Sequence, residues 1–318
     1  MANPNDQAEQ LYGVEGNPMP EGGHCGAVTL PGAVRLRYAR WGAKGNASRG
    51  TILLLHGRTE FIEKYYETIE DLRRLGFAVL TFDWRGQGAS SRLLSDPLKG
   101  HIEHFDQYLD DLDAILRQVL LPDCPPPHYL VGHSTGALMA LLSAPALTNR
   151  IDRMVLCAPF LKLQDLPMPQ RYFKRLLGFL TYVGFGRSYV PDTRGNIDRL
   201  DFAGNKLTSD PERLARRNAI IGQHRHLAIS GPTIAWLYSA FRAAENVSRP
   251  EFAASIKIPA QFILGTADKV ISTPFAEYYA SRMRAGAHLT IPGARHEILQ
   301  EKDIYREQAL AAIDAFLP

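Results

Sequence analysis

The feature that most constrains this sequence is the pentapeptide Gly132-His133-Ser134-Thr135-Gly136, which directly follows the apolar residues 129–131. A strand, a sharp turn and a helix in this order hold the serine hydroxyl clear of the backbone, and the glycines suit positions where strand and helix crowd together. Ordinary strand-to-helix turns also contain such glycines, so the rest of the chain must decide. The pattern predicts a nucleophilic serine if an acid and then a histidine follow later in the chain.

The composition places the chain among ordinary globular proteins. It has 318 residues, of which 45% are hydrophobic and 22% charged, and this length suits one α/β unit carrying an insertion. The net charge of +3 is too small to indicate a nucleic-acid partner. The longest aliphatic run near the start, residues 52–55, is far too short to cross a bilayer.

The cysteines and the first residues bear on the compartment. Cys25, Cys124 and Cys157 are odd in number and have no metal-binding spacing, which indicates reduced thiols and no metal site. Residues 1–25 lack a basic start and an apolar stretch, so we expect a flexible leader rather than a secretory signal. The predicted location is cytoplasmic, with peripheral contact at the inner membrane surface as an open alternative.

Buried strands alternate with helical segments along most of the chain. Continuous apolar runs predict buried strands, and residues 34–39 alternate as in an antiparallel strand near a sheet edge. Between the strands, helical spacing ends at glycine or proline, and a helix over residues 103–121 is expected to be broken by Pro122 and the proline run 125–127. This order predicts an α/β fold with a mostly parallel central sheet and helices on both faces. The expected buried strands are residues 51–55, 77–82, 129–131, 154–158, 261–264 and 288–291.

The alternation stops between residues 160 and 249, where short helical patterns are broken by prolines. An insertion at this point lies beyond the carboxyl ends of the strands, where the crevice of an α/β sheet is found. We therefore expect a helical cap over residues 160–249, above a core of residues 26–159 and 250–318. Decorative packing without a lid function is the alternative.

His296 is the candidate base for the serine. A serine hydroxyl needs a base within hydrogen-bond reach, and that base needs a carboxylate to orient it. Among ten histidines, His296 alone is expected in a loop at the carboxyl end of the final strand.

Asp268 is the candidate acid, because it directly follows the strand that ends at Leu264 and precedes His296. Glu297 is adjacent to the base and would point away from it. Asp83 precedes the serine, so we expect it to bond turn amides instead.

The oxyanion of an acyl transfer needs two donors, which are commonly backbone amides. One is expected from Thr135, the residue after the nucleophile, and the other from Arg58 in the loop that follows residues 51–55. His56 in the same loop is expected to pack beneath it.

Taken together, these motifs resemble the α/β-hydrolases of the monoacylglycerol lipase and bacterial lysophospholipase group. The resemblance covers about residues 26–316 and rests on His56-Gly57, the turn from Asp83 to Ser90, the Ser134 pentapeptide, Gly265-x-x-Asp268 and His296-Glu297. It implies an α/β-hydrolase fold with a helical cap, a Ser134–His296–Asp268 triad, oxyanion amides at Arg58 and Thr135, and no cofactor. Many members of the group carry an apolar residue where this chain has Thr135, which affects the acyl pocket more than the amide.

The expected cap is basic, with 12 Lys and Arg against 6 Asp and Glu between residues 160 and 230. Its segment 171–180 mixes bases with aromatic and aliphatic residues, as suits a lipid surface, an acyl tunnel or a phosphate head group. A solvated helix with an apolar inner face is the alternative. We therefore expect a serine esterase acting on single-chain lipid esters, with an acyl-enzyme on Ser134.

Other activities stay open from the sequence. A small-molecule carboxylesterase, or a thioesterase or acyltransferase, can use the same triad, and a non-catalytic binding module can use the same fold. The head group, the acyl length and the oligomeric state do not follow from the sequence.

Overall fold

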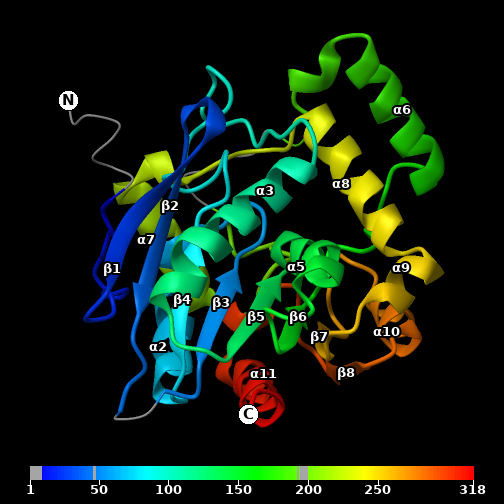
Figure 1. The fold of residues 1–318 in the computed structure, drawn as a ribbon. Helices are drawn as coiled ribbons and strands as arrows, with labels where there is room; N and C mark the ends of the chain where they lie inside the picture. Colours follow the sequence, from blue (N-terminus) through cyan, green and yellow to red (C-terminus); the bar gives the residue numbers. More distant parts are fainter. Residues whose placement is uncertain (1–8, 46–47, 192, 194–199) are drawn as a thin grey trace.

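The computed structural model describes residues 9–45, 48–191, 193 and 200–318 as one sheet surrounded by helices (Figure 1). The sheet has eight strands in the order β1-β2-β4-β3-β5-β6-β7-β8. The pairs β1–β2 and β2–β4 are antiparallel, and every other pair is parallel. The strands are β1 (His24–Leu30), β2 (Val34–Trp41), β3 (Thr51–Leu55), β4 (Ala78–Phe82), β5 (His128–His133), β6 (Arg153–Cys157), β7 (Ala260–Gly265) and β8 (Gly286–Ile291).

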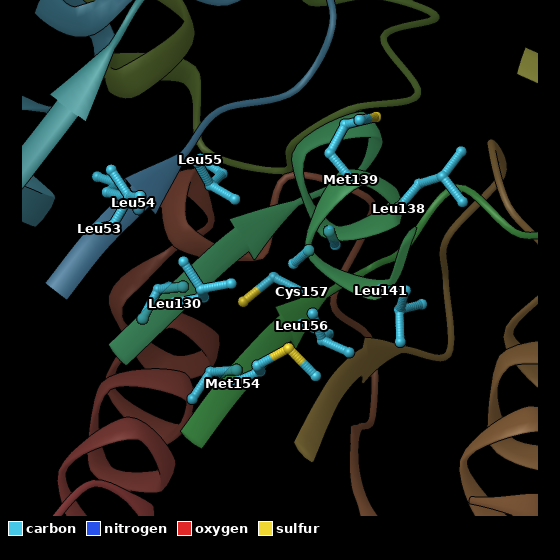
Figure 2. Close-up of a cluster of buried hydrophobic side chains, with 14 of the residues drawn as sticks. Leu53, Leu54, Leu55, Leu130, Leu138, Met139, Leu141, Met154, Leu156 and Cys157 are labelled. Atoms are coloured by element: carbon cyan, nitrogen blue, oxygen red, sulfur yellow. The ribbon is translucent and has the colours of Figure 1, made fainter. Parts of the chain in front are cut away.

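The expected α/β class is confirmed, because the continuous apolar runs form the central parallel strands. Every residue of β3, β4 and β5 is buried, as expected for strands covered on both faces. Figure 2 shows side chains from β3, β5 and β6 together with those of α5 (Thr135–Leu147), all within one apolar cluster. This cluster fixes the strand ends from which the candidate site residues project.

Helices connect the strands on both sides of the sheet. In Figure 1, α3 and α5 cross in front of the strands, and α11 lies behind them. Arg306 of α11 forms an ion pair of 2.6 Å with Asp71 of α2, which joins these two helices. The core helices are α2 (Tyr66–Arg74), α3 (Asp106–Ile115), α4 (Leu121–Asp123), α5, α10 (Thr273–Arg282) and α11 (Asp303–Phe316). Short helical turns lie at Pro31–Ala33, Ile62–Tyr65, Leu116–Leu120 and Ile298–Gln300.

The helical region expected over residues 103–121 continues through Pro122 to Asp123 and ends before the proline run 125–127. A π turn over Leu116–Leu120 follows α3, and the short helix α4 continues through Pro122 to Asp123. The amide of Leu121 bonds the carbonyl of Leu116, five residues back. Because proline lacks an amide proton, it is tolerated in the first turn of α4, where that proton is not needed.

Some described residues of the expected leader are packed against the rest of the chain. Tyr12 and Val14 are buried against the core and the cap, and the Asn17 amide donates to the carbonyl of Glu63 at 2.9 Å. His24 and Cys25 already belong to β1, at the sheet edge. Residues 1–8 lie outside the described residues.

Between β6 and β7, the described residues form helices and loops. The helices are α6 (Gln170–Tyr182), α7 (Pro211–Gln223), α8 (Ile234–Val247) and α9 (Pro250–Ser255), with short turns at Phe185–Arg187 and Arg225–Leu227. In Figure 1, α6 is the outermost of these helices, and α8 separates it from α5. The charged residues Asp192, Arg194, Asp198 and Arg199 of the expected basic cap lie outside the described residues. Within the described residues, no helix combines the length and apolar character needed to cross a membrane.

Candidate active site

Ser134 lies in a strained turn between β5 and α5. Its φ of 51° and ψ of −112° fall in a region that non-glycine residues rarely adopt. Gly136 is required here, because a Cβ atom would overlap the carbonyl oxygen of Leu55. The turn is held by the Ser134 amide, which donates to the Cys157 carbonyl at 2.9 Å. The strain and the tight packing together fix the position of the hydroxyl.

The structure brings Ser134, His296 and Asp268 into one chain of hydrogen bonds. The His296 Nε2 atom lies 3.1 Å from Ser134 Oγ, and its Nδ1 atom lies 2.7 Å from Asp268 Oδ2. The three residues come from the carboxyl ends of β5, β7 and β8, which meet at one edge because these strands are parallel. All three are buried.

Asp268 has its second carboxylate oxygen occupied as well. The amides of Val270 and Ile271 donate to Oδ1 at 2.7 and 3.0 Å. Burial raises the pKa of Asp268, but the hydrogen bond from His296 and these amides outweigh burial and hold the pKa below its usual value. An ionised Asp268 accepts the Nδ1 proton of His296 and leaves Nε2 free to take the serine proton.

Two backbone amides near Ser134 have no acceptor within the described part of the chain. They belong to Thr135, the first residue of α5, and to Arg58, in the loop after β3. The Arg58 loop comes close to the serine, because a Cβ atom added to Gly57 would lie 3.2 Å from Ser134 Cβ. Two unsatisfied donors beside a serine are suited to binding a negatively charged oxygen.

Asp83 and His56 lie in the packing beneath the loops. The Asp83 Oδ2 atom accepts from Arg37 Nε and the Ala89 amide, both at 2.8 Å, and Oδ1 accepts from the Ile62 amide at 3.1 Å. His56 is buried and bonds the carbonyl of Gly57 at 2.8 Å. Asp83 therefore bonds loop amides as expected, and it also neutralises the buried Arg37.

A group of charged side chains that the sequence reasoning missed lies directly beneath the triad. We call Glu60, Lys64, His133 and Glu297 the floor network. The Glu60 carboxylate accepts from His133 Nδ1 at 3.0 Å and from Lys64 Nζ at 2.8 Å, and Lys64 also contacts Glu297 at 2.6 Å. All four side chains are buried.

The floor network contacts the triad at His296. The Nε2 atom of His133 lies 3.1 Å from the backbone carbonyl oxygen of His296. Since that carbonyl and the Glu60 carboxylate both accept only, His133 donates from both ring nitrogens and carries a positive charge. The network thus ties the loop of Glu60, the turn of Ser134 and the loop of His296 to one another.

The pKa shifts of Glu60, His133 and Lys64 agree with charged forms of these three groups. Burial raises the pKa of Glu60, but His133 and Lys64 hold it well below the usual value. Burial lowers the pKa of His133 and of Lys64, and their carboxylate partners raise both above the usual values. Two acids and two bases cancel, so no uncompensated charge is left beneath the site.

The floor network left one trace in the sequence. Glu60 precedes, and Lys64 lies within, a mostly aromatic and aliphatic run at residues 61–66, where charges are costly unless they are paired. Their partners His133 and Glu297 are far away in the chain, so the sequence alone did not identify the pairs.

Residues between β6 and β7 bond to the loops that carry the candidate site. The amide of Glu297 donates to the carbonyl of Leu207 at 2.8 Å, and Gln164 Nε2 donates to the carbonyl of Asp268 at 3.0 Å. On the opposite side, the Ser230 amide bonds the carbonyl of Leu98 at 2.7 Å. These bonds tie the loops of Asp268 and His296 to the segment between β6 and β7.

Comparison with protein families gives one matching profile. It belongs to the family described as "Serine aminopeptidase, S33" and matches residues 46–303. The match spans most of the chain, from just before β3 to the start of α11.

Individual relatives agree with this match. Lysophospholipase L2 of Escherichia coli strain K12 is 31% identical over 291 residues, which cover 89% of this chain and 84% of the relative. Among solved structures, a soluble variant of the Saccharomyces cerevisiae monoglyceride lipase covers 94% of this chain and 96% of its own, with a TM-score of 0.75 and 19% identity. The monoacylglycerol lipase of Paleococcus ferrophilus has a TM-score of 0.70 and 24% identity, and covers 89% of this chain and 98% of its own. These structures establish the α/β-hydrolase fold.

Proposed function

The chain belongs to the S33 family of α/β-hydrolases, and from this premise we propose that it is a serine hydrolase that cleaves carboxylic esters of single-chain lipids. The observation that carries the proposal is the hydrogen-bond chain from Ser134 through His296 to Asp268. The curated relative named lysophospholipase L2 supports a lipid ester as the substrate. Lysophospholipids and monoacylglycerols are the two substrate types within the proposal.

The reaction has two steps that use the same groups. Ser134 Oγ attacks the ester carbonyl while His296 Nε2 takes its proton, and the oxygen that becomes negative accepts from the amides of Arg58 and Thr135. His296 then gives the proton to the leaving alcohol, so that the acyl group stays on Ser134. Water, deprotonated by His296, attacks this ester and releases the fatty acid.

The cap supplies an apolar surface that suits a lipid substrate. On α6, Tyr172, Leu176 and Phe179 are 46%, 41% and 61% exposed, and their spacing places them on one face of the helix. Arg171 and Arg175 are exposed on the same helix. A face of this kind enters the boundary between head groups and acyl chains while its bases contact anionic lipids. We propose that α6 makes peripheral contact with a lipid surface.

The proposed reaction is tested with a fluorophosphonate probe and a panel of substrates. Wild-type protein should be labelled, and Ser134→Ala should not. The panel contains a lysophospholipid, a monoacylglycerol, a short soluble ester, a thioester and an aminoacyl amide. Hydrolysis of the single-chain lipids at the highest kcat/KM supports the proposal. A preference for the short ester, thioester or amide refutes the lipid substrate, and absence of labelling in folded protein refutes the hydrolase.

The lipid-surface contact is tested by co-sedimentation with vesicles of phosphatidylcholine and phosphatidylglycerol. The double variant Leu176→Ser/Phe179→Ser should lose binding. Ile304→Ser is the matched control. Ile304 is also an exposed apolar residue, with an exposed fraction of 67%, but it lies on α11 rather than on α6. Equal vesicle binding by wild type and the double variant would refute the contact.

A further inference from the structure

Arg58 has a second feature besides its backbone amide. Its side chain extends from the loop beside Ser134 towards the cap, where the Nη2 atom donates to the carbonyl of Ser230. The guanidinium lies 5.3 Å from the centre of the Trp236 ring. It also lies against Gly100, whose missing side chain leaves room for it.

The charge of Arg58 lacks an anionic partner among the described residues. The guanidinium contacts a carbonyl and an aromatic ring, and its Nε atom is buried without a hydrogen-bond acceptor in the described part of the chain. Burial lowers the pKa of Arg58 to about 10. Arg37 shows the usual solution elsewhere in the molecule, since two carboxylates contact its buried guanidinium. A withdrawn arginine without a carboxylate is suited to an anion supplied by a ligand.

A cavity of about 360 Å³ opens at this side chain. Arg58 and Thr59 line it from the core, and Ile229, Ser230 and Gly231 line it from the cap. Its size is within the range of small-molecule sites. The cavity therefore joins the loop beside the reacting serine to the underside of the cap.

We propose that the Arg58 guanidinium and this cavity bind the phosphate of a lysophospholipid head group, which makes Arg58 a specificity-determining residue. The inference rests on the proposed function and narrows its substrate. A guanidinium donates two parallel hydrogen bonds to phosphate oxygens, whereas a monoacylglycerol has only a hydroxyl to offer at this place.

The lengths of the two partners agree. In a 1-acyl lysophospholipid, about six bonds separate the ester carbonyl carbon from the phosphorus atom. The same number of bonds separates the backbone nitrogen of an arginine from its Cζ atom. An ester whose oxygen lies at the Arg58 amide can therefore place its phosphate at the guanidinium of the same residue.

Arg58 also holds the cap through Ser230, so the test must separate binding from this structural contact. Arg92 provides the matched control. Its Nη2 atom donates to a cap carbonyl, that of His226, and burial lowers its pKa to about 10 as well. Arg92 does not line the cavity beside Arg58. Arg92→Met therefore removes a comparable cap contact and a comparable buried charge.

The experiment measures kcat/KM for 1-acyl lysophosphatidylcholine and for 1-monoacylglycerol of the same acyl chain. The readout is the ratio of the two values within each protein, since damage to the shared oxyanion site cancels in it. In Arg58→Met the ratio should fall about tenfold or more, because a hydrogen-bonded charge is lost. In Arg58→Lys the ratio should fall less, because lysine keeps the positive charge but cannot donate two parallel hydrogen bonds to the phosphate. In Arg92→Met the ratio should stay within about twofold of the wild-type ratio, because Arg92 does not contact the phosphate in the proposed site.

Inhibition distinguishes the lipid head group from free phosphate. Glycerophosphocholine should inhibit the hydrolysis of monoacylglycerol by the wild-type protein. It should inhibit the same reaction less in Arg58→Met. Inhibition by inorganic phosphate but not by glycerophosphocholine would overturn the proposal. An unchanged ratio in Arg58→Met, an equal fall in Arg92→Met, or a wild-type protein that cleaves monoacylglycerol but not the lysophospholipid would also overturn it. In each of these cases hydrolysis of monoacylglycerol by wild type leaves the proposed function standing.

Discussion

Beneath the triad, the buried charges of the floor network pair with one another, whereas the segment between β6 and β7 exposes apolar side chains, and no carboxylate among the described residues pairs with Arg58. Glu60, His133 and Lys64 are buried, and each has an ionic partner. On α6, Phe179 is 61% exposed, and Lys174 pairs with Glu245 at the surface. The two regions enclose the same serine but differ in how completely their groups are satisfied.

This difference separates two tasks. Some groups must hold His296 within hydrogen-bond distance of Ser134. Partners that satisfy all of their hydrogen bonds restrict these groups to a single conformation. Groups that choose a substrate must keep some of their surface and charge for it. We therefore expect changes in the floor to affect catalysis or folding strongly, and changes in the cap to have smaller effects on stability.

The largest expected effect is that of Asp268→Asn on turnover. An amide at this position can still accept from the amides of Val270 and Ile271, so the fold should persist. His296 would lose the carboxylate that fixes its tautomer, and kcat should fall by about 10⁴-fold. The measurement is kcat for a lipid ester, with the melting temperature recorded alongside.

The control for this prediction is Asp152→Asn, the same substitution at an exposed position after α5. It should leave kcat unchanged. A loss of less than about tenfold in Asp268→Asn, against the several orders expected of a triad acid, would show that Asp268 does not orient His296.

The second effect concerns the floor network itself. Glu60→Gln removes one charge and leaves His133 and Lys64 with too few anions, so the free energy of unfolding should fall by about 3–5 kcal/mol. Lys174→Met breaks the exposed pair with Glu245 in the cap and should cost about 1 kcal/mol or less. Urea denaturation at neutral pH measures both.

The floor contribution should also depend on pH. The pKa of His133 is raised in the folded protein, so its stabilisation is complete below its unfolded pKa, about 6.5, and is lost as the pH rises through the folded pKa. The pKa of Glu60 is lowered, so its contribution is complete above about pH 4.5 and is lost as the pH falls towards the folded pKa. The stability difference between wild type and Glu60→Gln should therefore be largest between these two limits. A difference that is small and independent of pH would refute a charged floor.

The parts of the molecule that the sequence predicted are those with local signals. Continuous apolar runs predict the central strands. Ser134 lies in a short motif, and the glycines that its sharp turn requires are within two residues of it. The strand-end positions of Asp268 and His296 follow from the order of the elements. These features need no knowledge of distant contacts.

The parts that the sequence did not predict depend on distant partners. Tyr12 lies in a segment without an apolar run, and it is buried because it packs against α7, His224 and the following turn. Glu60 and His133 each look like ordinary polar residues until the fold brings them to 3.0 Å. The passage of the helix through Pro122 depends on a π turn, for which the sequence has no simple signal.

The third effect concerns the N-terminal capping of α7 by Asp210. Asp210 accepts from the amides of Glu212 and Arg213 at 2.9 Å each and so caps the first turn of α7. Asp210→Ala should lower the free energy of unfolding by about 1–2 kcal/mol. Asp106→Ala, at the start of the core helix α3 where no side-chain cap bond exists, should cost about 0.3–1 kcal/mol. Equal losses in the two variants would refute the capping role of Asp210.

The smallest expected effect is a gain in stability within the cap. Gly222, near the end of α7, has open space where a Cβ atom would be and no positive φ, so Gly222→Ala should stabilise the protein by about 0.4–1 kcal/mol. Gly184 has similar open space but a φ of 96°, and Gly184→Ala should destabilise by about 1 kcal/mol because alanine is strained there. Gly136 beneath the site has no such room, because the carbonyl of Leu55 fills it. Thermal unfolding of the two cap variants separates backbone strain from crowding, and a loss of stability in Gly222→Ala would mean that the cap is packed as tightly as the floor.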